Sequence, residues 1–228
     1  MAPDAVKTSA LDGKELGARL AVIETALTMS RTGLSPGRSG NVSCRFGDGM
    51  LITPSGMAYD TLTPSDIVFV GDDGAVSPGS RKPSSEWHFH LAAYGARPEA
   101  GAVVHTHSMH ATVLACAHQP IPAFHYMVAA AGGADIPLVP YALFGTDELA
   151  RYVAQGLANR RACLMANHGQ IATGETLAAA LELAAEVETL AEQYSKVLML
   201  GPPRLLTAAE MDAALERFKT YGQKAQSC

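Results

Sequence analysis

The sequence predicts a single α/β domain in which a mixed sheet is flanked by helices. The chain has 228 residues, a length that fits one large domain. Hydrophobic residues make up 48% and charged residues 17%, so a sizeable apolar core can form. Short β-branched runs alternate with segments of helical period, but without a strict strand–helix–strand rhythm. We therefore expect one domain over 1–228, with a loose end at 1–10.

The first expected elements are a helix and a hairpin. Leucine and isoleucine recur at helical spacing over residues 15–32, and Gly33 ends this helix. Two strand-like runs, 41–46 and 50–53, flank Gly47-Asp48-Gly49. A glycine on either side of an aspartate between two strands is typical of a hairpin turn.

Similar signals define the later elements. Ser84 or Ser85 is expected to cap a helix that runs to about Arg97, just before Pro98. One continuous apolar stripe predicts a long helix over 176–200. The other expected helices are 108–117, 147–157 and 207–218. The other expected strands are 67–70, 101–106, 136–140, 162–166 and 170–173.

Charge and cysteine content argue against several classes of protein. The formal net charge is -5 and no basic block occurs, so we expect no nucleic-acid partner. The longest run without charged residues, 100–134, is rich in histidine and contains two prolines, which predicts strand, turn and site rather than a membrane span. The four cysteines form no C-x-x-C pair, which indicates reduced thiols in the cytoplasm. Cys116 and Cys163 are expected in the core.

The sharpest chemical signal is His105-Thr106-His107. Residues two apart on a strand share a face, so these two rings project together from backbone positions about 6.7 Å apart. His168, in a tight turn beside Gly169, offers a third imidazole, and Glu86 precedes the strand in a helix. Three histidines and one carboxylate suit Zn²⁺ or another first-row divalent ion.

This pattern also has a simpler interpretation. The H-x-H spacing arises by chance, and histidines also satisfy buried polar networks. Two rings on a buried strand are costly unless they share a partner, which favours a metal. His88 and His90 have the same spacing, but on a helix they point about 200° apart, so we assign them to packing or the surface. Three further histidines could support the ligands from outside: His110, His118 and His125.

Eight short motifs, in order from Ser39 to Gly222, resemble the class II aldolase family, which contains both aldolases and epimerases of sugar phosphates. Each motif alone is weak, but their shared order is specific. The motifs are Ser39-Gly40-Asn41-Val42-Ser43, Ile52-Thr53-Pro54-Ser55-Gly56, Pro83-Ser84-Ser85-Glu86-Trp87, His105-Thr106-His107, His125-Tyr126-Met127, Tyr141-Ala142-Leu143-Phe144-Gly145, Asn167-His168-Gly169 and Phe218-Lys219-Thr220-Tyr221-Gly222.

The resemblance implies a fold, an assembly and a metal centre. Family members are single α/β domains around a mostly antiparallel central sheet, and they form fourfold tetramers with active sites between neighbouring subunits. The resemblance assigns His105, His107 and His168 to one divalent metal per subunit, with Glu86 completing the shell. Zinc is the expected metal, with manganese or cobalt as alternatives. Glu86 is also the expected general base.

The resemblance also assigns the substrate contacts. Tyr126 matches a tyrosine that reaches in from a neighbouring subunit and passes a proton at the aldehyde-derived oxygen. Phe144 and Tyr221 match residues that line the aldehyde end. The expected phosphate pocket consists of small polar loop residues, namely Ser39, Asn41, Ser55, Gly56, Ser84 and Ser85. Hydroxyls and backbone N–H groups of this kind suit a dianion.

The implied activity is cleavage of a ketose 1-phosphate to dihydroxyacetone phosphate and an aldehyde. The substrate is expected to be L-fuculose 1-phosphate or a related deoxy- or methylthio-pentulose 1-phosphate. A metal-dependent decarboxylase and a pentulose-phosphate 4-epimerase are the alternatives within the family. The epimerases usually have Asp where this chain has Glu86. A decarboxylase would need a cation for the carboxylate, and Arg38, Arg45, Arg81 and Lys82 lie near the site loops. The family's non-enzymatic membrane-skeleton branch is expected to lack the metal histidines.

Overall fold

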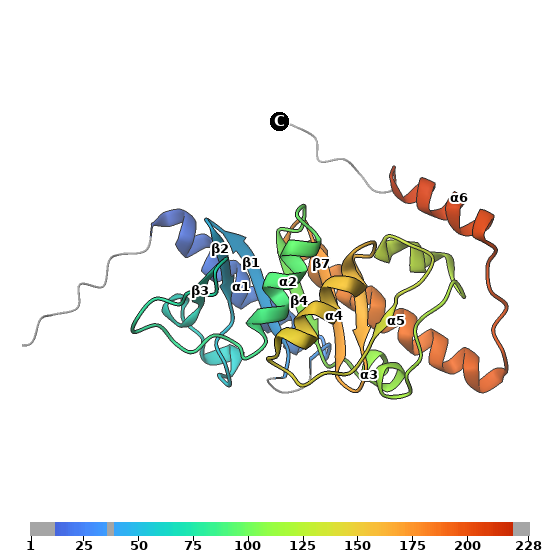
Figure 1. The fold of residues 1–228 in the computed structure, drawn as a ribbon, viewed down its shortest axis with the longest axis horizontal. Helices are drawn as coiled ribbons and strands as arrows, with labels where there is room; N and C mark the ends of the chain where they lie inside the picture. The colour runs from blue at the N-terminus through green and yellow to red at the C-terminus, as the bar shows by residue number, and fades with distance from the viewer. Residues whose placement is uncertain (1–11, 36–38, 221–228) are drawn as a thin grey trace, which may run out of the picture.

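A seven-stranded sheet runs through the molecule in the order β3-β2-β1-β4-β7-β6-β5 (Figure 1). The computed structural model describes residues 12–35 and 39–220. The strands are β1 (Asn41–Phe46), β2 (Gly49–Ile52), β3 (Val68–Gly71), β4 (Ala102–Thr106), β5 (Leu138–Val139), β6 (Ala162–Met165) and β7 (Gly169–Gly174). Among these described strands only the β5–β6 pair is parallel, and the other neighbouring pairs are antiparallel. The predicted mixed, mostly antiparallel sheet is confirmed.

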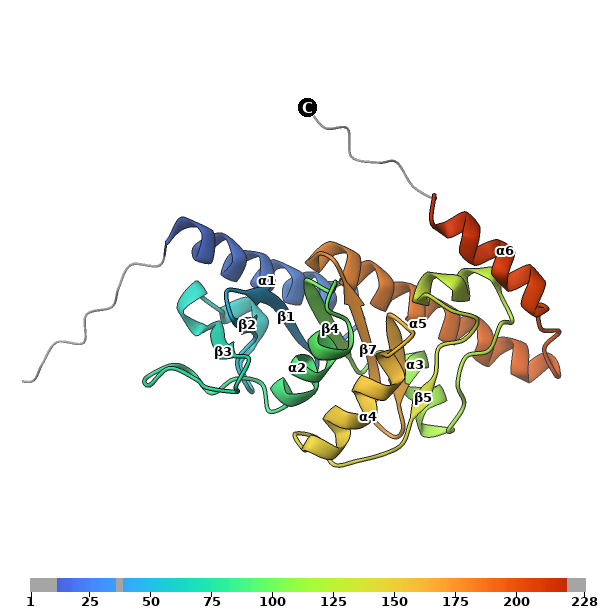
Figure 2. The same ribbon diagram turned by 45° about the horizontal axis from the view of Figure 1, so that its top comes forward.

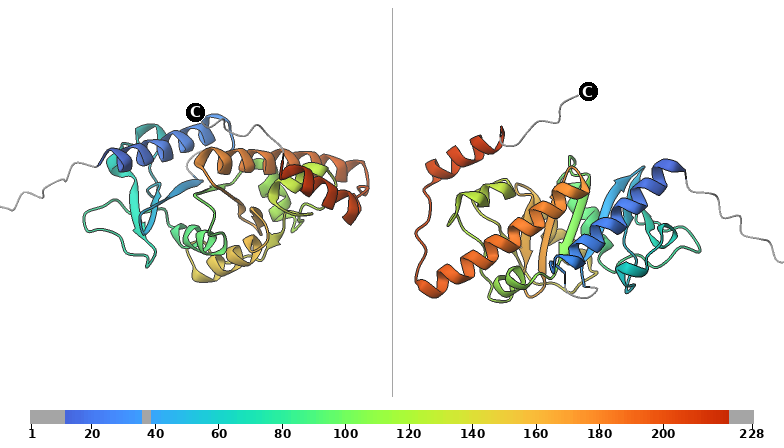
Figure 3. Two further views of the ribbon diagram at one scale, coloured as in Figure 1. Left: turned by 90° about the horizontal axis from the view of Figure 1, so that it is seen from above. Right: turned by 180° about the vertical axis from the view of Figure 1, so that it is seen from behind.

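Helices cover both faces of this sheet. The α-helices are α1 (Gly13–Arg31), α2 (Trp87–Ala96), α3 (Met109–Cys116), α4 (Asp147–Leu157), α5 (Leu177–Leu200) and α6 (Ala208–Phe218). Three short 3-10 helices are η1 (Tyr59–Thr61), η2 (Pro64–Asp66) and η3 (Tyr126–Ala131). Helices α1 and α5 lie along one face, and α2 and α4 pack together on the other (Figure 3). None of the helices in the described ranges is long and apolar enough to cross a membrane.

The strand period of two divides the core between the two faces. On β4, the side chain of Val104 packs with residues of α1 and α5, whereas that of Val103 packs with α2 and α4. Val103 and Val104 are both fully buried. Because β4 lies at the centre of the sheet, its side chains are covered on both sides. The end of β4 is therefore a rigid, buried platform.

Helix α6 lies away from the sheet and packs against η3 (Figure 2). Its first turn has a capping box, in which Thr207 and Glu210 satisfy each other's backbone N–H groups. This helix has only one fully buried residue, Met211. It is therefore a peripheral element that adds little to the central core.

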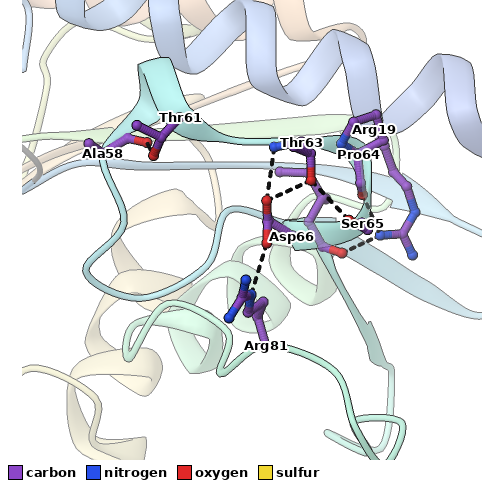
Figure 4. A network of polar contacts seen from close by, with 9 residues as sticks. Arg19, Ala58, Thr61, Thr63, Pro64, Ser65, Asp66 and Arg81 are labelled. Atoms are coloured by element: carbon purple, nitrogen blue, oxygen red, sulfur yellow. Dashed lines mark hydrogen bonds and ion pairs between the residues drawn. The ribbon is translucent and has the colours of Figure 1, made fainter.

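A polar network fixes the connection between β2 and β3 (Figure 4). The Asp66 carboxylate accepts hydrogen bonds from the Thr63 backbone N–H at 2.9 Å, the Thr63 hydroxyl at 2.7 Å and Arg81 Nε at 2.8 Å. Arg19, on α1, donates to the backbone carbonyl of Pro64 at 3.0 Å and to that of Ile67. The connection is thus held to α1 and to the segment that leads into α2.

Several local predictions need correction. The helix after Ser84 begins at Trp87, and Glu86, not a serine, occupies its N-cap position. Ser84 still belongs to the extended segment, because its backbone N–H donates to Thr53. Cys163 is buried in β6 as expected, but Cys116 is exposed, because it lies at the end of α3 outside that helix's buried face.

Candidate metal centre and active site

The ends of three adjacent strands meet at the middle of the sheet. In the register of the sheet, Asn41 at the start of β1 lies opposite His105 near the end of β4. Thr106 at the end of β4 lies opposite Gln170 at the start of β7. His107 directly follows β4 and His168 directly precedes β7. Antiparallel pairing therefore brings residues from distant parts of the sequence to one place.

The three predicted histidines converge as expected. The ring centroids of His105, His107 and His168 are 4.8–4.9 Å apart in every pairing. Glu86 joins them, with Oε1 2.9 Å from His168 Nε2 and Oε2 3.3 Å from His105 Nε2. One ligand atom from each of these four residues lies within 4.8 Å of all the others. The four groups thus form a metal-binding cluster.

The hydrogen bonds of the cluster leave donor atoms for a cation. His105 Nδ1 is 2.8 Å from the Gln170 carbonyl, which can only accept, so Nδ1 carries the hydrogen and Nε2 has a free lone pair. His105 Nε2 and His107 Nε2 are buried without a hydrogen-bond partner among the described residues. Such atoms are costly unless a ligand satisfies them. Three imidazoles and a carboxylate are a donor set that fits a divalent first-row metal.

Electrostatics in the cluster favours metal binding at neutral pH. Burial would raise the pKa of Glu86, but His105, His168 and the Asn41 amide outweigh it and lower the pKa to about 2. Burial also lowers the pKa of His105 well below its ordinary value, although the Glu86 charge opposes this. Burial and the neighbouring His168 lower the pKa of His107. At neutral pH the cluster thus offers an ionised Glu86 carboxylate and unprotonated His105 and His107 rings, which are the forms that bind metals.

The backbone restricts which residues can stand on either side of His168, at positions 167 and 169. A Cβ atom on Gly169 would lie 2.4 Å from the Thr106 carbonyl oxygen, so only glycine fits between β4 and the turn. Asn167 adopts a left-handed conformation with φ 55°. Its side-chain oxygen accepts a hydrogen bond at 2.8 Å from Nε2 of His118, which is also left-handed, with φ 54°. Of the three histidines expected to support the ligands from outside, His118 therefore contacts the turn that carries His168.

A cavity of about 460 Å³ opens directly onto the cluster. Its lining contains Glu86, His107 and His168, together with the predicted substrate residues Ser39, Asn41, Ser55, Gly56, Ser84, Ser85 and Phe144. Its serine-rich wall consists of two segments, 53–56 and 82–85, that lie side by side. The backbone N–H of Ser55 donates to the Lys82 carbonyl, and that of Ser84 donates to the Thr53 carbonyl. His105 is fully buried behind this cavity.

Two predicted residues do not line the cavity. Tyr126, in η3, is 54% exposed and absent from its lining. The expectation from the resemblance, that Tyr126 acts at the site of a neighbouring subunit, stays a prediction. Tyr221 lies outside the described residues.

The sequence analysis missed His90, which it assigned to packing or the surface. His90 is fully buried and bonded to Asn41, which in turn donates to Glu86. The signal was available, because Glu86, His90 and Tyr94 are spaced by four residues and so share one helix face.

The fold and the cluster together define a class II aldolase, and the comparisons with known proteins agree. The model of the "Class II Aldolase and Adducin N-terminal domain" family matches residues 20–195. The chain is 53% identical over 216 residues to the 5-methylthioribulose-1-phosphate/5-deoxyribulose-1-phosphate aldolase of Rhodospirillum rubrum, covering 95% of this chain and 97% of that protein.

Other relatives carry a different substrate name. The chain is 52% identical over 202 residues to the L-fuculose phosphate aldolase of Escherichia coli strain K12, covering 88% of this chain and 94% of that protein. A solved structure of an L-fuculose 1-phosphate aldolase superimposes with a TM-score of 0.86 at 39% identity, covering 91% of this chain and all of that one. This chain therefore belongs to the class II aldolase family, and its activity is that of a carbon–carbon lyase.

Proposed function

We propose that this protein is a metal-dependent aldolase that cleaves a ketose 1-phosphate to dihydroxyacetone phosphate and an aldehyde. The observation that carries the proposal is that one cavity joins the histidine–glutamate cluster to the serine-rich loops. The candidate substrates are L-fuculose 1-phosphate and the 5-methylthio- and 5-deoxy-pentulose 1-phosphates. Relatives named for these substrates are almost equally similar to this chain, at 52% and 53% identity. An assay must therefore decide between them.

The phosphate is assigned to the serine-rich wall. Ser55, Ser84 and Ser85 would surround it with hydroxyl donors, Gly56 lines the same wall, and Ser39 and Asn41 would complete the pocket. Phe144 lies in the same cavity and is assigned, with Tyr221, to the aldehyde end. Because the phosphate and the cluster share one cavity, the carbonyl end of a short sugar phosphate would face the cluster.

His105, His107, His168 and Glu86 are proposed to hold one divalent ion, most simply Zn²⁺, with Mn²⁺ or Co²⁺ as alternatives. Such an ion supplies Lewis acidity that stabilises the negative charge developing on the substrate oxygens. In the direction of synthesis, Glu86 removes a proton from the carbon that forms the new bond. Tyr126 of a neighbouring subunit donates a proton to the aldehyde oxygen, and cleavage reverses both transfers. This role of Tyr126 is the reason to propose a homotetramer with shared sites.

The placement of two arginines favours an aldolase over a decarboxylase. Arg45 donates to the carbonyl groups of Ala100 and Tyr94, and Arg81 pairs with Asp66. No Lys or Arg occurs in the cavity lining within the described ranges. A carboxylate substrate would therefore lack a cation from Arg45 or Arg81. The cytoplasmic location and the extent of the domain over 1–228 stay predictions.

The test is a turnover assay on the zinc-loaded protein with each of the three ketose 1-phosphates. A coupled NADH-linked dehydrogenase would detect dihydroxyacetone phosphate, and a chelator-treated sample would serve as the control. We expect metal-dependent release of dihydroxyacetone phosphate from at least one substrate. Release of none from any of the three would refute the proposal. Release of CO₂ from a sugar acid phosphate, or epimerisation at C4 without cleavage, would support the alternatives.

A further inference from the structure

A chain of hydrogen bonds runs from Glu86 into the core behind the metal cluster. Asn41 Nδ2 is 2.7 Å from Glu86 Oε2, and Asn41 Oδ1 is 2.5 Å from His90 Nε2. His90 Nδ1 is 2.7 Å from Ser43 Oγ, which is 2.8 Å from the Tyr94 hydroxyl. The chain thus alternates between β1, which carries Asn41 and Ser43, and α2, which carries His90 and Tyr94.

The inner part of this network is closed to solvent. Ser43 and His90 are fully buried and Tyr94 is 3% exposed, whereas Asn41, 4% exposed, lies where the network meets the cavity. Arg45 lies over the Tyr94 ring, with its guanidinium carbon 4.6 Å from the ring centroid, and closes the far end. Because the bulk solvent does not reach His90, Ser43 and Tyr94, each of these groups must satisfy its neighbour.

The chemistry of the groups determines every hydrogen-bond direction. An ionised carboxylate can only accept, so the Asn41 NH₂ group faces Glu86 and the Asn41 oxygen faces His90. The amide oxygen also only accepts, so His90 Nε2 must carry a hydrogen. His90 Nδ1 of a neutral ring then accepts from the Ser43 hydroxyl. Ser43 in turn accepts from the Tyr94 hydroxyl.

We propose that His90, Ser43 and Tyr94 are positioning residues that lock the Asn41 amide in the one orientation that donates to Glu86, with His90 held as the Nε2–H tautomer. The lock fixes the carboxylate rotation. Oε2 is held by Asn41, while Oε1 points to His168. Without these positioning residues, the Asn41 amide could rotate and turn its oxygen toward the Glu86 carboxylate. The two oxygens would then repel each other. The neutral state of His90 has a physical basis, because burial lowers its pKa to about 3 although the Glu86 charge opposes this.

The tautomer can be measured on the full-length, metal-free wild-type protein. Long-range ¹H–¹⁵N spectra of ¹⁵N-histidine-labelled protein distinguish the two neutral tautomers and the protonated ring, and the signals lost in His90→Gln assign His90. We expect the Nε2–H pattern at pH 7. An Nδ1–H pattern or a protonated ring would overturn the proposal. This measurement needs only a folded His90→Gln for the assignment, so it does not depend on whether His90→Leu folds.

The lock can be tested separately by Zn²⁺ affinity, measured by chelator competition on folded variants. His90→Leu removes the donor to Asn41 and should weaken Zn²⁺ binding about tenfold or more, as for other residues that orient metal ligands. His90→Gln keeps an N–H near the Nε2 position and should bind within about threefold of wild type. His88→Leu, on the same helix but outside the network, is the matched control and should not change affinity.

Two outcomes of this titration would overturn the lock. Wild-type affinity in folded His90→Leu would show that Asn41 needs no support. Equal weakening in His90→Leu and His90→Gln would show that the ring shape, not the donor, is needed. The inference relies on the proposed function only for the metal, and neither readout uses a sugar phosphate. An inactive but zinc-binding protein would therefore refute the aldolase proposal and leave this one testable.

Discussion

Replacing Gly169 by alanine should disrupt the metal centre through the backbone alone. The added Cβ would lie 2.4 Å from the Thr106 carbonyl oxygen and 3.3 Å from the Cα atom of His107. An ordinary contact needs about 3.4 Å or more, so β4 and the turn must separate by about 1 Å. His107 follows Thr106 and His168 precedes Gly169, and both histidines belong to the cluster. The pairing of β4 with β7 at Thr106 holds these two histidines close to each other.

The size of the effect follows from similar cases of overpacking. Forcing an extra methyl group into a packed site costs about 1–3 kcal/mol. For a domain of this size, about 2 kcal/mol lowers the melting temperature by roughly 4–8 °C. A displacement of about 1 Å between two ligands should also weaken Zn²⁺ binding at least about tenfold. Turnover should fall with it.

Thermal unfolding of the metal-free protein and chelator competition for Zn²⁺ measure the two effects separately. Gly95→Ala is the matched control, because a Cβ on Gly95, near the end of α2, meets nothing within 4 Å. It should leave Zn²⁺ affinity unchanged and raise stability by up to about 1 kcal/mol. If Gly169→Ala had both the melting temperature and the Zn²⁺ affinity of wild type, the steric reasoning would be wrong.

Four further predictions concern other parts of the molecule. Glu86→Gln should lower turnover by about 10²–10⁴ while the circular dichroism spectrum stays unchanged; wild-type turnover would remove Glu86 from the mechanism. Removing the metal with a chelator should lower the free energy of unfolding by about 2.7 kcal/mol, relative to a sample with free metal at one hundred times its dissociation constant. An unchanged melting curve would argue against a bound ion. Asn167→Ala should be about 1 kcal/mol less stable than Asn167→Gly in urea unfolding, because both lose the bond to His118 but only alanine resists the left-handed backbone. Asp66→Asn should lower the free energy of unfolding by about 1–2 kcal/mol at pH 7. Because hydrogen bonds from Thr63 and Arg81 lower the Asp66 pKa below its ordinary value of 3.8, this loss relative to wild type should be constant at neutral pH and shrink as acid protonates the carboxylate. A loss that grew in acid would contradict this sign.

Much of the fold could be predicted from local signals. The hairpin at Gly47, the stripe of α5 and the β-branched run of β4 all have their expected structures, because the pattern of apolar residues follows the burial each element needs. Strand order is a long-range property. Nothing in the periodicity of β1 indicates that it pairs with both β2 and β4. The rhythm of the elements predicted a mixed sheet, and the resemblance to a family supplied its mostly antiparallel character.

The candidate site was predictable for a different reason. Metal chemistry needs imidazoles at short spacing, and the geometry of a strand places His105 and His107 side by side. The support behind Glu86 could not be predicted in the same way, since the partners of His90 come from β1, more than forty positions away. Likewise, Asn167 and His118 reveal their left-handed backbones only in the structure, because most asparagines and histidines are right-handed.

The place of β7 within the sheet has a consequence for biosynthesis. This strand is the last to be made, yet it lies between β4 and β6 and begins directly after His168. A growing polypeptide that stops at β6 carries Glu86, His105 and His107 but lacks the strand that joins the two halves of the sheet. The four cluster residues can therefore come together only after most of the chain has left the ribosome.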